Sequence, residues 1–169
     1  MSVDRERLQN RLHAVAVALC AWLVLTSPWV SMLRRIPSGA GLLDRAHVVL
    51  GFAGLVVGLA YTYACARGGR WRLYFPWLAG NVRPAVRDVA GLFRARLPSA
   101  EGGGLFAMIE GLLLLALLIA GVTGLAWFVL QGSAEAVACR GVHIVAARVL
   151  VGLIVAHVLA VAAHLLELA

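Results

Sequence analysis

Residues 141–168 read GVHIVAARVLVGLIVAHVLAVAAHLLEL, a mostly apolar segment with three histidines, of which His143 and His157 are the most informative pair. Such a segment is long enough to cross the roughly 30 Å hydrocarbon core of a membrane as one helix. His143 and His157 are fourteen residues apart, so at about 100° per residue they return to within roughly 40° of one face. They are also about 21 Å apart along the axis, at about 1.5 Å per residue. One helix face therefore presents an imidazole near each side of a membrane.

The composition is that of an integral membrane protein. The chain has 169 residues, of which 62% are hydrophobic and only 14% charged, and its mean hydropathy is +0.90. A soluble domain carries about 25% charged residues. We therefore expect an all-α fold, a single membrane domain over residues 1–169 built as a four-helix bundle. The apolar segments predict helices over residues 12–33, 46–66, 105–130 and 141–168.

The arginines predict the orientation of this bundle. All fifteen basic residues are arginine, and the formal net charge is +7. Ten lie on one side of the predicted helices, three of them before residue 12 and seven in the loop over residues 67–104. The other side has four, which are Arg34, Arg35, Arg45 and Arg140. By the positive-inside rule both termini are cytoplasmic. The positive charge then indicates topology and contact with membrane lipid, and we expect no nucleic acid partner.

The loop over residues 67–104 contains a predicted amphipathic helix at about residues 82–97. Asn81 suits its N-cap, and Pro84 suits its first turn. Apolar residues recur at helical spacing on one side, at Val82, Val86, Val89, Phe93 and Leu97. Arginines largely take the other side, at Arg83, Arg87, Arg94 and Arg96. We expect this helix to lie on the cytoplasmic membrane surface, and a docking surface for a partner is the alternative.

The predicted topology sorts four histidines into two pairs of equal depth. His13 begins an outward helix and His157 lies late in an inward one, so both are near the inner face. His47 and His143 each begin an inward helix, so both are near the outer face. Imidazole is a good ligand for haem iron, and one pair fills both axial positions of one haem. The pattern predicts two haems that transfer electrons rather than bind oxygen. A haem-free bundle whose histidines serve packing, proton or metal movement is the alternative.

Other residues are candidates for contact with the predicted cofactors. Arg148 lies inside a predicted membrane helix, where a propionate of the outer haem is one natural counter-charge, and Arg45 is a second candidate for such a contact. Glu110 is the one charge in residues 105–130 and either serves function or snorkels to water. His164 binds a propionate or a quinone, or only reaches the inner interface, which we favour. The glycines at 51, 54 and 58 share the His47 face and indicate close helix packing, a groove for the macrocycle, or both.

The histidine placement resembles that of the bacterial cytochrome b561 family, within the superfamily that holds the cytochrome b subunits of nickel-iron hydrogenases and formate dehydrogenases. One histidine opens the first helix (RLHAV), one opens the second (RAHVVLG), and two lie on the fourth (GVH and VAH). The resemblance implies two haem b groups, the inner one on His13 and His157 and the outer one on His47 and His143. It also implies the bacterial inner membrane and electron exchange with quinone. No local motif here matches a quinone site, and the first helix lacks the tryptophan often found after its histidine.

Two functions stay open at this point. The resemblance favours an electron-transfer subunit that exchanges electrons with the quinone pool and with an iron–sulfur or other redox subunit. The alternative is a stand-alone superoxide:quinone oxidoreductase, an enzyme by itself. The two predicted outer loops are short and leave little surface for a large outer partner.

Overall fold

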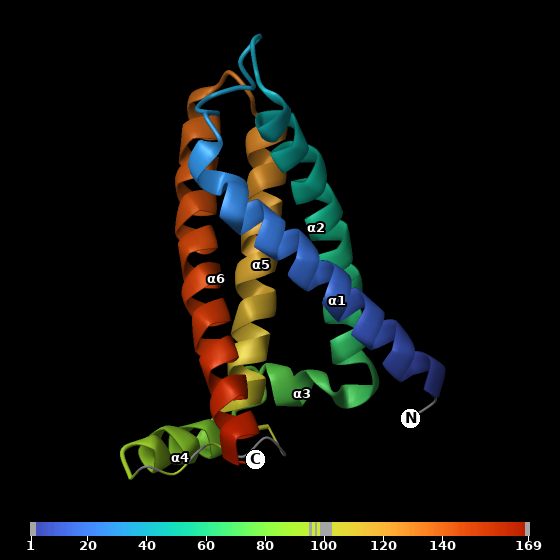
Figure 1. Ribbon diagram of the computed structural model, residues 1–169, viewed down its shortest axis with the longest axis vertical. Helices are drawn as coiled ribbons and strands as arrows, with labels where there is room; N and C mark the ends of the chain where they lie inside the picture. Colours follow the sequence, from blue (N-terminus) through green and yellow to red (C-terminus); the bar gives the residue numbers. More distant parts are fainter. Residues whose placement is uncertain (1–2, 95, 97, 99–102, 168–169) are drawn as a thin grey trace. The chain divides into compact units, whose positions relative to one another are not determined.

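The computed structural model describes residues 3–94, 96, 98 and 103–167. All regular secondary structure in these residues is helical. No strand occurs among these residues. The elements are α1 (Val3–Thr26), η1 (Ser27–Trp29), α2 (Leu42–Ala66), η2 (Arg67–Gly69), α3 (Trp71–Tyr74), α4 (Arg83–Leu92), α5 (Leu105–Val129) and α6 (Ala134–Glu167) (Figure 1). Four segments of the described chain are long and apolar enough to cross a membrane, namely Asp4–Trp29, Leu42–Ala66, Leu105–Val129 and Ala134–Leu165. The prediction of an all-helical protein with four such helices is confirmed.

The first helix is shifted toward the N-terminus relative to the predicted residues 12–33. It begins at Val3 because the polar lead contains no helix breaker, and Asp4 and Glu6 in its first turn suit the positive end of the helix dipole. It ends at Thr26 because Pro28 has no N–H to continue the helix and disfavours the α conformation at the residue before it. A 3-10 turn, η1, takes over there.

The last helix begins seven residues before the predicted position, at Ala134 instead of residue 141. Ser133 acts as its cap, because the Ser133 hydroxyl accepts a hydrogen bond from the Ala136 N–H at 3.3 Å. Gly132 directly before it has a φ of 90°, a conformation that glycine adopts without strain. The connection between the last two long helices is thus only the four residues 130–133, in place of the predicted 131–140, and Arg140 lies on the helix. Residue 168, the predicted end, is outside the described residues.

The helix predicted over residues 82–97 is shorter in the structure, where α4 comprises Arg83–Leu92. Pro84 lies in its first turn, but the N-cap is Val82 and makes no side-chain hydrogen bond, so the prediction of Asn81 as N-cap is wrong. The helix ends at Leu92 because the chain turns at Gly91, whose carbonyl accepts the N–H groups of Arg94 and Arg96 at 2.8 and 3.0 Å. Residues 95 and 97, inside the predicted range of 82–97, are not among the described residues.

The described chain divides into two compact units. The first unit comprises Met1–Ala64 and Ala116–Val149, and the second comprises Cys65–Leu115 and Leu150–Ala169. The prediction of a single membrane domain stays a prediction.

In the first unit, the chain between α1 and α2 is fixed by hydrogen bonds. Residues 30–36, which we call the strap, bond to residues of the α5–α6 turn and of the adjoining helices. The bonds run from Trp127 Nε1 to the Leu33 carbonyl (2.9 Å), from Arg140 Nε to the Met32 carbonyl (2.8 Å), from the Ile36 N–H to Gln131 Oε1 (2.9 Å) and from the Gly132 N–H to the Arg34 carbonyl (3.0 Å). Each bond satisfies a polar group that the loop would otherwise leave unpaired.

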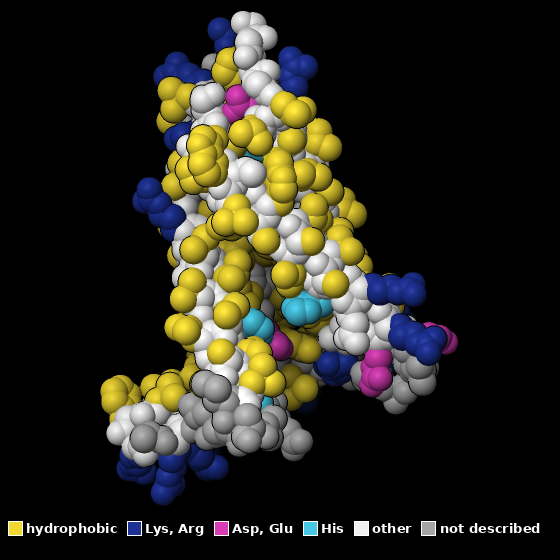
Figure 2. Space-filling model, viewed as in Figure 1, with side chains coloured by type: hydrophobic (Ala, Val, Ile, Leu, Met, Phe, Trp, Pro, Cys, Tyr) yellow, Lys and Arg dark blue, Asp and Glu magenta, His cyan; other side chains and the backbone are white. Residues whose placement is uncertain are grey.

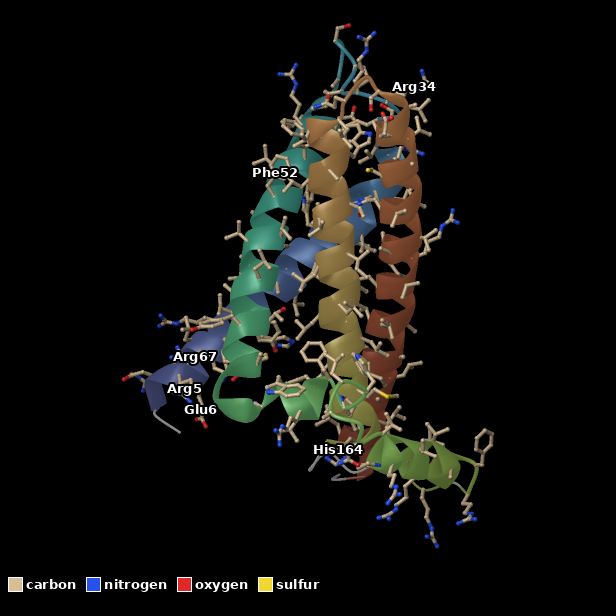
Figure 3. The ribbon with its side chains drawn as sticks, turned by 180° about the vertical axis from the view of Figure 1, so that it is seen from behind. Arg5, Glu6, Arg34, Phe52, Arg67 and His164 are labelled. Carbon is tan, nitrogen blue, oxygen red and sulfur yellow. The ribbon has the colours of Figure 1, made fainter. Side chains whose placement is uncertain are left out.

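The strap also covers an apolar cluster. Met32, Trp127 and Ala136 are buried there, and Val48 and Cys139 pack against them. Figure 3 labels Arg34 on the strap and Phe52 on α2; the Phe52 ring makes an edge contact with Phe128, at 5.1 Å between centroids. The strap is therefore a rigid closure of this end of the unit.

Glycines bring the helices of the first unit close together. A Cβ at Gly58 would lie 3.2 Å from Leu117, and one at Gly121 would lie 2.8 Å from Leu55, so α2 and α5 approach at these positions. Gly54 faces Leu23 of α1. Gly51 has open space around its Cβ position instead. Of the three glycines on the His47 face, two therefore serve helix packing and one borders open space.

In the second unit, α4 is joined to the start of α5. Asp88 of α4 accepts a hydrogen bond from the Leu105 N–H at 2.8 Å and so caps α5. Gly104 has no room for a side chain, because a Cβ would collide with the Asp88 carboxylate. Gly111 of α5 likewise lies directly against the carbonyl of Tyr74 at the end of α3. These contacts fix α3 and α4 on the first turns of α5.

Candidate functional site

The first unit brings two of the predicted ligands together. His47 lies in the second turn of α2 and His143 in the third turn of α6, and both side chains are half-buried. Their ring centroids are 6.3 Å apart and the ring planes are nearly perpendicular, at 81°. Two helices far apart in sequence thus present their imidazoles to the same place.

A backbone carbonyl orients the His143 ring. His143 Nδ1 lies 2.8 Å from the carbonyl oxygen of Ala120 on α5. Because a carbonyl only accepts hydrogen bonds, Nδ1 donates its proton and Nε2 keeps a free lone pair. Gly124, one turn along α5, allows this approach, since a Cβ there would be 3.3 Å from Nδ1. This is the arrangement by which proteins set the tautomer and direction of a metal-binding histidine.

The His47 ring has an unsatisfied nitrogen. Its Nδ1 is buried and has no hydrogen-bond partner within the described part of the chain. Buried polar atoms are normally paired, so an unpaired one needs an explanation. Gly51, one helical turn further on, adjoins open space. His47 Nδ1 is therefore a buried polar atom whose partner is not among the described residues.

The separation of the two rings fits a pair of axial ligands. With metal–nitrogen distances of about 2 Å, imidazoles on opposite sides of one metal ion have ring centroids roughly 6 Å apart. The centroids of His47 and His143 are 6.3 Å apart. The described residues contain no group of three or more His, Cys, Asp or Glu side chains that could hold a metal ion alone. A haem needs only two protein ligands, because the macrocycle supplies the other four.

Asp44 is a charged neighbour that sequence analysis missed. Its side chain is only 6% exposed, and its carboxylate accepts hydrogen bonds from the Ser31 N–H at 2.9 Å and the Ser31 hydroxyl at 3.3 Å. It precedes His47 by three residues, which places it about 60° from His47 around α2. The sequence could have pointed to Asp44, because it is an acidic residue on the same face as His47 at the start of an apolar helix.

The two predicted propionate arginines point less directly to the pair. Arg45 and Arg148 are both exposed. Arg148 follows His143 by five residues and so lies about 140° away around α6. Arg45 precedes His47 by two residues and lies about 160° away around α2. Helix geometry does not direct either guanidinium to the imidazoles, and their role stays a prediction.

His13 contacts an aromatic residue of α2. Its ring is exposed to one side and packs against Tyr61, with 5.6 Å between centroids and 36° between planes. Tyr61 follows His47 by fourteen residues, the same spacing that separates His143 from His157. That repeated spacing was a signal for Tyr61 that sequence analysis did not use.

His157 and His164 lie in the second unit. Both are half-buried, and the Nδ1 atoms of both are buried without a hydrogen-bond partner among the described residues. His13 belongs to the first unit, so the pairing of His13 with His157 stays a prediction. His164, labelled in Figure 3, packs against Phe106 of α5, with 6.3 Å between centroids. The role of His164 stays a prediction.

Comparison with known proteins adds one finding. The family model of prokaryotic cytochrome b561 matches residues 6–168, nearly the whole chain. Searches of curated proteins and of solved structures returned no match.

Proposed function

The chain belongs to the prokaryotic cytochrome b561 family, and we propose that it carries electrons across the bacterial inner membrane through two b haems. Family membership and the four candidate spans make it an integral membrane b-type cytochrome that transfers electrons. The proposed part is the number of haems, their ligands, the quinone partner and the orientation in the membrane.

The single observation that carries the proposal is the geometry of His47 and His143. Their ring centroids are 6.3 Å apart, and the hydrogen bond from His143 Nδ1 to the Ala120 carbonyl leaves Nε2 free to bind iron. These two residues would hold one haem b. His13 and His157 would hold the second, which is supported by the fourteen-residue spacing on α6 and the equal predicted depth.

The chain's own residues define the environment of the first haem. A bound haem supplies one-electron chemistry, and two histidine ligands leave no open position for oxygen. The apolar cluster of Met32, Trp127 and Ala136 has Val48 and Cys139 packed against it, and these two lie next to this site in sequence on α2 and α6. Asp44 adds a buried carboxylate, which favours positive charge nearby and hence the oxidised state of a neighbouring iron.

The proposed partners are quinone and a second redox protein. The protein acts in this proposal as the membrane subunit of a redox complex, with an iron–sulfur or other redox subunit on one side and the quinone pool as the other partner. Ten arginines on one side against four on the other support cytoplasmic termini, with α4 as a cytoplasmic interfacial helix.

One observation favours the stand-alone superoxide:quinone oxidoreductase as second candidate. Arg34, Arg35 and Arg45 are exposed around the α1–α2 connection, and Figure 2 shows basic side chains gathered there. Arg34 and Arg35 belong to the strap, which is short and hydrogen-bonded to the α5–α6 turn and the adjoining helices. Such a surface attracts a small anion more readily than it accommodates a large subunit.

Optical spectroscopy and turnover test these proposals. A reduced-minus-oxidised spectrum of the purified full-length protein should show low-spin b haem, with two haems counted per chain. No haem, or one, would overturn the two-haem proposal. Reduction of a quinone by the purified single chain when superoxide is supplied would select the second candidate. If the protein contains haem but lacks that activity, the proposal of an electron-transfer subunit in a redox complex would be favoured.

A further inference from the structure

The α4 helix has three distinct sides, and the first attaches it to the end of a membrane-spanning helix. Ala85 is only 1% exposed, and Asp88 accepts the Leu105 N–H at 2.8 Å. Leu105 is the first residue of the candidate span Leu105–Val129. This attachment holds α4 at the level where a membrane helix begins, which is the boundary between hydrocarbon and headgroups.

The second side of α4 is an exposed apolar stripe. It is formed by Val82, Val86, Val89 and Phe93, all of which are exposed. Phe93 is 88% and Val86 62% exposed. At about 100° per residue the three valines fall within an arc of roughly 60°, and Phe93 is the C-cap that directly follows the helix. Within the described residues nothing covers this stripe, and an apolar row of this kind marks an interaction site.

The third side of α4 is basic. Arg83, Arg87 and Arg94 are exposed. Arg83 and Arg87 fall within an arc of roughly 40° on the helix, centred about 110° around the axis from the stripe, and Arg94 comes two residues after the helix ends. Figure 2 shows dark blue basic side chains gathered along one side of α4 and hydrophobic ones along another, and Figure 3 shows the nitrogen-bearing side chains of α4 extending to the same side. Apolar and cationic sides next to each other match the cross-section of a phospholipid leaflet.

We propose that α4 is a binding site for anionic phospholipid. The apolar stripe enters the acyl-chain boundary, and the three arginines bind headgroup phosphates, for which a guanidinium is well suited. The attachment of α4 to the first residue of a span identifies the occupant as lipid, because that level of the molecule is surrounded by the leaflet. Anionic headgroups complement the three positive charges. This inference goes beyond electron transfer and does not depend on haem.

Lipid selectivity in reconstituted vesicles tests the arginine side. The purified full-length protein is placed in phosphatidylcholine vesicles with a trace of spin-labelled phosphatidylglycerol or phosphatidylcholine, and the motionally restricted fraction of each label is measured. We expect a severalfold preference for phosphatidylglycerol that weakens as salt is added. R83Q/R87Q/R94Q should lose most of this preference. A triple variant with unchanged preference would overturn the proposal.

A matched triple variant controls for net charge. R5Q/R7Q/R11Q removes the same charge from α1, and we expect it to keep most of the preference. If both triple variants lost the preference equally, the selectivity would reflect general charge, and the α4 site would be rejected. If each variant has the same haem spectrum as the wild type, the helical bundle is intact. A change in lipid preference can then be told apart from a failure of the haem proposal.

Cysteine accessibility tests the apolar stripe. F93C lies on the stripe, whereas A90C lies on the exposed flank nearer the arginines. In phosphatidylglycerol-containing vesicles, a water-soluble thiol reagent should label A90C at a severalfold higher rate than F93C. The wild type, with Cys20, Cys65 and Cys139, gives the background. Equal labelling of the two variants would place the stripe in water, as expected for a face reserved for a protein partner, and would contradict the lipid site.

Discussion

At the scale of single residues, the orientation of His143 depends on one carbonyl and one missing side chain. The Ala120 carbonyl takes the Nδ1 proton, and Gly124 leaves the space that the ring needs. Neither contact follows from the sequence of α6, because both partners lie on α5. The sequence identified the histidine, but its tautomer is set by a helix that packs beside it.

Gly124→Val should therefore disturb the haem that we assign to His47 and His143. The new Cβ would lie 3.3 Å from Nδ1 and 3.4 Å from Cε1, so the ring must move at an overpacking cost of about 1–3 kcal/mol. We expect lower haem content or a shifted midpoint potential for this haem in a redox titration. Gly141→Val is the control, because nothing lies within 4 Å of a Cβ there. Equal effects in both variants would show that helix propensity alone is responsible.

Asp44 gives a second prediction at this scale. Asp44→Asn keeps the shape of the side chain but removes the negative charge, so the reduced haem is no longer disfavoured. The midpoint potential of the His47–His143 haem should rise by on the order of tens of millivolts, from the Coulomb energy at an effective dielectric constant of about 20. Ser31→Ala removes one hydrogen bond to Asp44 but keeps the charge, and should shift the potential much less. If D44N and the wild type had the same midpoint potential for this haem, Asp44 would have no part in setting that potential.

At the scale of elements, helix type was predictable and helix ends were not. Apolar length identifies four long helices from sequence. The helix ends depend on which of several nearby residues caps or breaks the helix. Pro28 ends α1, Ser133 caps α6 earlier than predicted, and the chain turns at Gly91 after α4. The strap could not be predicted, since its hydrogen bonds join residues about a hundred positions apart in sequence.

The strap predicts a stability effect. Trp127→Phe removes the Nε1–H donor and leaves the Leu33 carbonyl without that bond. Loss of this part-buried hydrogen bond costs about 0.5–1.5 kcal/mol. The purified W127F protein should lose its haem spectrum at a lower temperature than the wild type. Trp29→Phe, at a side chain that is 68% exposed, should leave that temperature almost unchanged, and equal shifts would argue against the strap as the cause.

The repeated fourteen-residue spacing on α2 leads to a prediction about Tyr61. Tyr61 packs against His13 with 5.6 Å between ring centroids, so Tyr61→Leu should loosen that ring and shift the potential of the haem assigned to His13. The potential of the His47–His143 haem should stay as it is. Tyr63→Leu, at a side chain that is 63% exposed, is the control. If Y61L instead shifted the midpoint potential of the His47–His143 haem, the placement of Tyr61 beside the haem of His13 would be wrong.

At the scale of the whole molecule, composition and histidine spacing were enough to identify an integral membrane cytochrome, and the family match agrees. The reason is that only a few kinds of fold can span a membrane, so the lengths of the apolar segments are enough to predict a helical bundle. The surroundings of the ligands were not accessible in this way. Tyr61 and Gly124 contact histidines on other helices, and Asp44 contacts Ser31 on the strap. An apolar sequence gives little information about which segments meet in this way.

The proposed path of electrons across the membrane depends on which histidines share a haem. Haem per chain should be measured for full-length H47L, H143L, H47L/H143L and H47L/H13L. We predict that the first three each lose the same single haem, because either histidine of a pair is required, and that H47L/H13L loses both. If H47L/H143L instead lost both haems while H47L/H13L kept one, the pairing would be wrong, and with it the proposed path of electrons across the membrane.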